Sequence, residues 1–483
     1  MVAHPHYVKA CVFLFALSGL TTAAVPASGR PTDETIVGWV RSALASDPRV
    51  KSGDIAVKSI EGIVTLDGTV TTLAEKEFAD LEAKKIRGVQ AVIDKLEVKP
   101  AYRLDAEIRQ DLRRRIIRSS FIKSENVGVS VENGVVVLRG TVGSAAEKNE
   151  VSLLAAEVRG VKSVDNHLAV AYEIKPADME IRKNAAAKLS RDVYLTGLPI
   201  TVSVKNGVAT LNGETHNVYE KDRAEDDLMN LFNVTDVKND LKVAWPKSEK
   251  TANNLREIPD SALSAMIREE LSLDPRFDVP GAIKVQDQHG AITLTGSVPS
   301  YYQKQLAERD VEQIAGVEWV NNLLVVKGVW RDDAGLYMDI RDALASDYRI
   351  GGDKVDFYVL DGVVSLKGNV NSDYEKSCVD KDVAGIIGVK DIKDNLIVEW
   401  VPVTSDDTLK ARIFDRLAAN WDTWLLLDKI IINVKEGNAV LTGTVDNRVQ
   451  REEAGWVASQ TTGVVSVDDR LKVQENNNKI GMK

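Results

Sequence analysis

A spacing of three glycines recurs along this chain and constrains its fold more than any other feature. The pattern is a glycine, five residues, a second glycine, nineteen residues and a third glycine, and it occurs six times. A fixed internal period predicts an array of similar units, because each copy encodes the same element order. The positions are Gly62, Gly68, Gly88; Gly134, Gly140, Gly160; Gly207, Gly213 with Asn233 in the third place; Gly290, Gly296, Gly316; Gly362, Gly368, Gly388; and Gly437, Gly443, Gly463.

Other residues keep the same register around the glycines. In the first copy Glu75 and Lys76 follow the second glycine, Asp94 and Leu96 follow the third, and every copy has equivalents. A chain of 483 residues is long enough for several domains. We therefore expect six domains, at 33–99, 105–172, 177–245, 260–328, 332–401 and 406–474, with a polar linker at 246–257.

Each copy predicts the element order α-β-β-α-β. Alternating apolar residues such as Ile55 and Val57 indicate strands, and Asn-Gly or Asp-Gly pairs indicate hairpin turns. We expect the second glycine where a strand packs beneath a helix, and the third glycine at the left-handed end of the second helix. The fold class is therefore α/β (α+β), with two helices on one face of a three-stranded mixed sheet. An aspartate is expected to be the N-cap of each first helix: Asp33, Asp105, Asp178, Asp260, Asp332 and Asp406.

The N-terminus is typical of an export signal. Lys9 is the only charged residue before Arg30, residues 10–20 are apolar, and small residues near Ala27 offer a cleavage site. These features predict a signal peptide at 1–27. The alternative is a retained membrane anchor, although the apolar run is shorter than the ~20 residues that span a bilayer. Cleavage would leave Cys378 as the last cysteine, so no intrachain disulfide is expected.

The charge balance argues against a nucleic-acid partner. The formal net charge is −10, with a pI near 5.3, whereas binding to DNA or RNA needs a basic face. Beyond residue 30 the histidines are His167, His216 and His289, which stand at different places in the repeat. The chain has none of the short motifs that mark nucleotide, zinc or redox sites. We therefore predict no catalytic residues, no cofactor and no metal.

The repeated residues resemble the BON domain family over residues 33–474. The resemblance rests on the GxVxLxG block, the Glu-Lys pair and the closing GVxxVxNxLxV pattern, seen in Gly160–Val170 of the second copy. It implies two helices on a three-stranded sheet. It also implies a place in the bacterial periplasm or outer envelope, a link to envelope stress and, in some members, phospholipid binding.

Two repeated polar positions are interpreted as structural. Glu75 and its equivalents adjoin a basic residue on an early helical turn, which is typical of a solvated helix start. Asp94 and its equivalents precede the last strand, where a turn or a backbone hydrogen bond is a better interpretation than a metal ligand.

Two segments depart from the repeated pattern and are candidate lipid-binding sites. The first is a basic helix face in the second copy, formed by Arg109, Arg113, Arg114 and Arg118. An exposed basic face attracts anionic lipid by ~1 kcal/mol per charge. The alternative is a solvated face with local ion pairs.

The second segment places apolar residues where other copies are polar: Trp421, Trp424, Leu426 and Leu427. An exposed apolar cluster indicates a membrane or partner contact. The alternative is packing against a neighbouring repeat or a second copy of the chain.

Together these features predict a non-enzymatic periplasmic protein that binds anionic phospholipid surfaces and supports the cell envelope under osmotic stress. The alternative is a periplasmic chaperone or a scaffold that binds envelope proteins.

Overall fold

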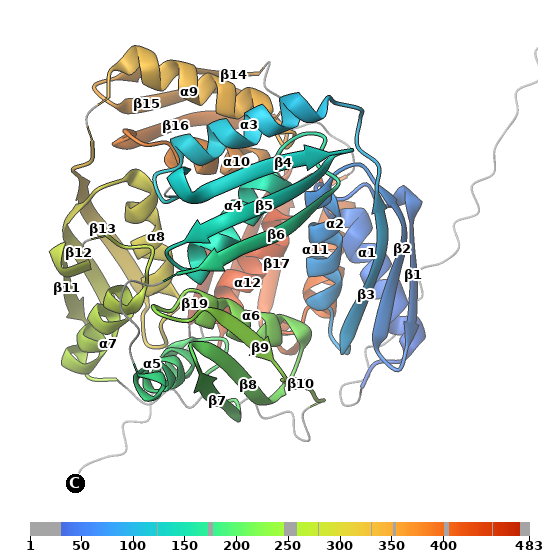
Figure 1. The fold of residues 1–483 in the computed structure, drawn as a ribbon. Coiled ribbons are helices and arrows are strands. Elements are labelled where there is room, and N and C mark those ends of the chain that lie inside the picture. Colours follow the sequence, from blue (N-terminus) through green and yellow to red (C-terminus); the bar gives the residue numbers. More distant parts are fainter. Residues whose placement is uncertain are drawn as a thin grey trace, which may run out of the picture. The chain divides into compact units, whose positions relative to one another are not determined.

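The computed structural model describes residues 30–122, 124–171, 177–245, 258–278, 280–329, 331–350, 354–399, 405–446 and 448–473. The expected signal peptide (1–27) and linker (246–257) lie outside these ranges. The described residues form twelve α-helices and six sheets in repeated units (Figure 1). The predicted fold class is therefore confirmed. None of the described helices combines the length and apolar composition that crossing a membrane requires.

Each repeat contributes one longer and one shorter helix. The first helices have 14 residues and are α1 (Asp33–Ser46), α3 (Asp105–Arg118), α5 (Asp178–Arg191), α7 (Asp260–Leu273), α9 (Asp333–Ser346) and α11 (Asp406–Ala419). The second helices have 12 residues and are α2 (Leu73–Lys84), α4 (Ala145–Ala156), α6 (Val218–Met229), α8 (Tyr301–Glu312), α10 (Asp373–Ala384) and α12 (Arg448–Ser459).

In every sheet the second strand is central, antiparallel to the first strand and parallel to the third. The first two strands of each repeat form a hairpin: β1 (Ile55–Ile60) and β2 (Ile63–Val70), β4 (Val127–Glu132) and β5 (Val135–Val142), β7 (Ile200–Lys205) and β8 (Val208–Thr215), β11 (Ile283–Gln288) and β12 (Ala291–Val298), β14 (Val355–Leu360) and β15 (Val363–Val370), β17 (Ile430–Lys435) and β18 (Asn438–Val445).

The third strands are β3 (Ala91–Val98), β6 (Ser163–Val170), β13 (Trp319–Val326), β16 (Asp391–Val398) and β19 (Ser466–Val473). In the third repeat this strand is broken into β9 (Asp236–Asn239) and β10 (Lys242–Val243), both parallel to β8.

Each repeat builds its own hydrophobic core between the helices and the sheet. In the first repeat Ile36 and Val40 of α1 and Ala79 of α2 pack with Val64 and Leu66 of β2, all fully buried. The other five repeats have equivalent clusters. Burial of these apolar side chains is the main stabilising contribution within each unit.

The repeated aspartate holds the hairpin turn instead of capping the helix. Asp33 is the first helical residue, and Thr32 is the N-cap. The Asp33 carboxylate accepts hydrogen bonds from the backbone N–H groups of Glu61 and Gly62, both at 2.8 Å. The N-cap prediction is therefore wrong for Asp33 and for its equivalents Asp105, Asp178, Asp260 and Asp406. It is confirmed at Asp332.

The second glycine of each repeat marks a close approach, but to backbone and not to a helix. Gly368 in β15 has φ +130°, and a Cβ there would lie 2.1 Å from the carbonyl oxygen of Lys354. In the other five copies a Cβ would meet the carbonyl oxygen of the residue directly before the first strand in the same way. The expectation that this glycine packs beneath a helix is therefore wrong.

The third glycine position adopts the expected left-handed conformation, with φ +90° at Gly88 and +69° at Asn233. It does not end the second helix, however, because α2 already ends at Lys84. The intervening residues include Ile86, which forms a β-bridge with Asn420 of the sixth repeat. That contact accounts for the extra residues between helix and glycine.

We predict that Gly368→Ala destabilises the protein by about 2 kcal/mol or more, because the methyl group meets a backbone oxygen and the φ angle is unfavourable for alanine. Gly385→Ala is the matched control, since its Cβ would lie 3.5 Å from the nearest atom at a helical φ of −70°. Urea denaturation of both variants measures the difference. Equal midpoints would contradict this explanation of the second glycine.

Candidate functional site

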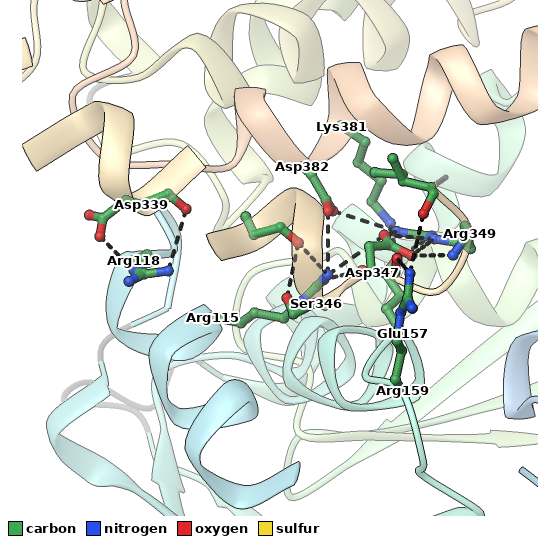
Figure 2. Close-up of polar contacts among 12 residues, drawn as sticks. Arg115, Arg118, Glu157, Arg159, Asp339, Ser346, Asp347, Arg349, Lys381 and Asp382 are labelled. Atoms are coloured by element: carbon green, nitrogen blue, oxygen red, sulfur yellow. Dashed lines mark hydrogen bonds and ion pairs between the residues drawn. The ribbon is translucent and has the colours of Figure 1, made fainter. Parts of the chain in front are cut away.

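The structure separates the arginines of α3 into two groups. Arg109 and Arg113 are exposed, and Arg114 pairs with Asp111 of the same helix. Arg118 turns to α9 of the fifth repeat, where its Nε lies 2.8 Å from Oδ1 of Asp339 (Figure 2). The expectation of one exposed face of four arginines is corrected, because Arg118 is an inter-repeat contact.

Arg115, which the sequence analysis did not select, is buried in an ionic cluster between the second and fifth repeats. Its guanidinium lies 3.2 Å from Glu157, 3.3 Å from Asp382 and 3.6 Å from Asp347 (Figure 2). Arg349 completes the cluster, with Nη1 2.7 Å from Glu157 and Nη2 2.5 Å from Asp347. Arg115 is next to Ile116 and three residues after Leu112, and both of these apolar residues are buried. Its position beside the apolar stripe of the helix is the sequence feature that could have indicated its burial.

Opposite charges control the protonation of this cluster. Burial favours a raised pKa for Glu157, but Lys381, Arg349 and Arg115 outweigh it and lower the pKa to about 2. For Asp382, burial dominates the attraction of Arg115 and raises the pKa to about 8. The neighbouring carboxylates of Glu157 and Asp382 thus shift in opposite directions, because the cations outweigh burial at Glu157 and burial outweighs them at Asp382.

The same cluster contains the group of three acidic residues that, within the described ranges, lie close enough to share a metal ion: Glu157, Asp347 and Asp382. Arg115, Arg349 and Lys381 already contact these carboxylates. The donor set is therefore neutralised by side chains of the protein itself, so we interpret the cluster as a structural contact.

The ionic cluster belongs to a pairing of the second and fifth repeats. Ser119, after the first helix of the second repeat, forms a β-bridge with Ile386, after the second helix of the fifth. Val158 and Asp347 form the reciprocal bridge. Each repeat thus presents the same two segments to the other, as in an isologous dimer interface.

Two further pairs use the same segments. The first and sixth repeats are joined by the bridge of Ile86 with Asn420 and by a 2.7 Å hydrogen bond from Thr462 N to Ser46 O. The third and fourth repeats are joined by the bridge between Asp192 and Ile314, and by Phe232 N donating to Leu273 O at 2.8 Å. The six repeats therefore form three pairs.

The eleventh residue of the first helix differs in a complementary way within each pair. Arg115 is matched by Ala343 in the fifth repeat, and Arg416 of the sixth repeat by Ala43 in the first. The large cation of one repeat reaches the acids of the other, as Arg416 does with Glu82 at 2.9 Å. In the remaining pair Lys188 contacts Glu270 directly.

The candidate segment at 421–427 lies against other parts of the protein. Leu426 is fully buried in the core of the sixth repeat, and Leu427 is half-buried against it. The rings of Trp421 and His216 stack at 5.8 Å, and Trp424 packs on the Arg87 guanidinium. The expected exposure is therefore corrected, since His216 and Arg87 belong to the third and first repeats.

The expectation that Glu75 and its equivalents are solvated residues at a helix start is wrong. Its side chain is 4% exposed and accepts hydrogen bonds from the backbone N–H groups of Lys51 and Thr71, at 2.6 and 2.8 Å. The carboxylate thus joins the helix start to the segment before the sheet. The backbone role predicted for Asp94 is confirmed, because its Oδ1 accepts from Leu96 N at 2.8 Å.

The repeats match one known family along nearly all of the described chain. The BON domain model matches residues 32–100, 104–172, 177–244, 259–328, 332–399 and 405–475. The chain belongs to the BON domain family. Osmotically-inducible protein Y of Escherichia coli is 36% identical over 143 residues, which are 28% of this chain and 71% of that protein. The outer membrane lipoprotein DolP of Haemophilus influenzae is 28% identical over 169 residues, 33% of this chain and 87% of that protein.

We predict that Arg115→Met lowers the stability of this BON-domain chain by about 3–5 kcal/mol, because it removes one of the three cations that neutralise three buried carboxylates. Arg113→Met, two residues earlier on the exposed side of α3, is the matched control and should change stability by less than ~0.5 kcal/mol. Guanidinium unfolding of the two variants provides the comparison. A small effect at Arg115 would show that the cluster contributes little to the pairing.

Proposed function

We propose that this protein is a non-enzymatic component of the bacterial cell envelope, exported to the periplasm, that binds anionic phospholipid surfaces. Membership of the BON domain family supports this assignment. So do the relatives, one named for osmotic induction and one named as an outer membrane lipoprotein. We also propose a role in envelope integrity under osmotic stress, which the name of the first relative supports.

The observation that carries lipid binding is the exposed side of α3. Arg109 and Arg113 are four residues apart, and Ile117, four residues further, is 64% exposed. This spacing places the two cations and the apolar side chain on one side of the helix. Cations next to exposed apolar groups favour an anionic membrane surface, where charge attracts and the apolar group enters the interface.

A second candidate function is protein binding, as a periplasmic chaperone or scaffold. It is favoured by β13 of the fourth repeat, an edge strand whose outward residues Trp319, Leu323 and Val325 are each more than half exposed. The equivalent residues of β19 are Ser466, Arg470 and Lys472, so this apolar strand face is not part of the repeated pattern. Exposed apolar edge strands favour strand addition by a partner.

Cosedimentation with vesicles of phosphatidylglycerol and phosphatidylcholine tests the lipid proposal. We expect Arg109→Gln with Arg113→Gln to weaken binding by about 2 kcal/mol at low salt, on the scale of ~1 kcal/mol per charge. The loss should shrink as salt screens the surface.

Arg182→Gln with Lys183→Gln is the matched control, since it removes two exposed cations from the first helix of the third repeat. If binding depends on α3, this control variant should bind the vesicles as strongly as the original chain does. Equal losses in both double variants would indicate attraction by net charge alone. Undiminished binding of the α3 variant would favour the protein-binding alternative.

A further inference from the structure

A large cavity lies where the second, third, fourth and fifth repeats meet. Its volume is about 730 Å³, and helices α4, α6, α8 and α10 line it. Small-molecule sites typically have volumes of roughly 300–1,000 Å³. The cavity is separate from the exposed side of α3 to which we assign lipid binding, and neither the family nor the relatives' names assign it a ligand.

Carboxylates from four different repeats face this cavity: Glu150 of α4, Asp226 and Asp227 of α6, Asp310 of α8 and Asp380 of α10. Asp227 is 7% exposed, and its Oδ2 has no hydrogen-bond partner among the described residues. Oδ1 of Asp380 is also buried without such a partner. Buried polar atoms without partners are rare in proteins and indicate a missing group such as a ligand or water.

Most of the positive charges around the cavity are already paired with acidic residues. Lys188 contacts Glu270, Arg223 contacts Asp192 at 2.6 Å, and Arg276 contacts Asp310 at 2.9 Å. Lys381 contacts Glu157 in the ionic cluster, and Arg191 contacts Glu269, although Nη1 of Arg191 has no hydrogen-bond partner among the described residues. Arg309 is exposed. In the part of the chain that the structure describes, Glu150, Asp226 and Asp380 have no ion pair with these cations, so the acids around the cavity exceed the cations.

The spacing of these carboxylates argues against a single metal ion. Within the described residues, the acidic group compact enough for one ion is the cluster of Glu157, Asp347 and Asp382, and it does not include the cavity carboxylates. A ligand for the cavity therefore needs several positive charges that are held apart. Apolar side chains of Phe121, Leu153 and Leu306 also line the walls and suit a hydrocarbon chain between those charges.

We propose that this cavity binds a linear organic polycation of the polyamine class, with its ammonium groups facing Glu150, Asp226, Asp227 and Asp380 and its methylene segments against the apolar wall. Each ammonium group donates hydrogen bonds to a carboxylate in a partly desolvated site, where such bonds are stronger than in water. Because four repeats contribute to the cavity, the bound polycation stabilises the assembled chain and not one isolated repeat.

Titration calorimetry of the chain from residue 28 onward with spermine tests the proposal. We expect saturable binding near one equivalent, and a higher melting temperature that magnesium at equal ionic strength does not reproduce. The triple variant Glu150→Gln, Asp226→Asn, Asp380→Asn should weaken spermine binding by about tenfold or more, since it removes charges that face the ligand.

The matched control is Asp67→Asn, Asp165→Asn, Asp356→Asn, which makes the same change in net charge at exposed strand positions. It should bind spermine like the original chain. Equal weakening in both triple variants, or equal stabilisation by magnesium, would show non-specific attraction to an acidic protein and would overturn the proposal. Absence of saturable spermine binding would overturn it as well. The lipid assay is independent of these outcomes.

Discussion

Buried charges at the contacts between repeats are the constraint on which the arrangement of the chain depends. The side chains of Arg115 and Arg416 each contact acidic residues of another repeat, and Lys188 contacts Glu270 of another repeat in the same way. A buried charge without its partner costs several kcal/mol, so each cation favours the repeat that carries its acids. Two arginine repeats paired with each other would place like charges together and leave acids uncompensated elsewhere. The pairs are therefore selected by charge as well as by shape.

The pairing of the repeats determines which arginines of α3 are buried in a contact and which stay exposed. Arg115 and Arg118 stabilise the contact between the second and fifth repeats, whereas Arg109 and Arg113 on the same helix stay exposed. One helix thus combines a structural side and the exposed side to which we assign lipid binding in our proposal. The same packing encloses the acidic cavity, because the second helices turn their polar sides toward one another where four repeats meet. Functions that a single BON domain could not support thereby become possible in the six-repeat chain.

Sequence reasoning predicted what each repeat encodes for itself. The six units, the hairpin turns, the left-handed third glycine and the backbone role of Asp94 all follow from local patterns, and the structure bears them out. The predicted role was wrong for residues whose contact partners are distant in the sequence. Asp33 resembles a helix cap but binds a hairpin 28 residues later, and Glu75 resembles a surface residue but is buried. Arg115 and Trp421 could not be placed, because the repeat register contains no information about which unit lies beside which.

The central claim is that the repeats pair as first with sixth, second with fifth and third with fourth. Each pair joins one repeat before the 246–257 linker to one repeat after it. Residues 31–245 and 258–473 produced as separate chains should therefore form a one-to-one complex when mixed, since each repeat has its own core and the buried ionic contacts of Arg115, Arg416 and Lys188 cross between the halves. Sedimentation velocity measures this directly. A stable one-to-one complex, weakened by Arg115→Met and not by Arg113→Met, is the predicted result. Two folded halves that remain separate at micromolar concentration would contradict the pairing.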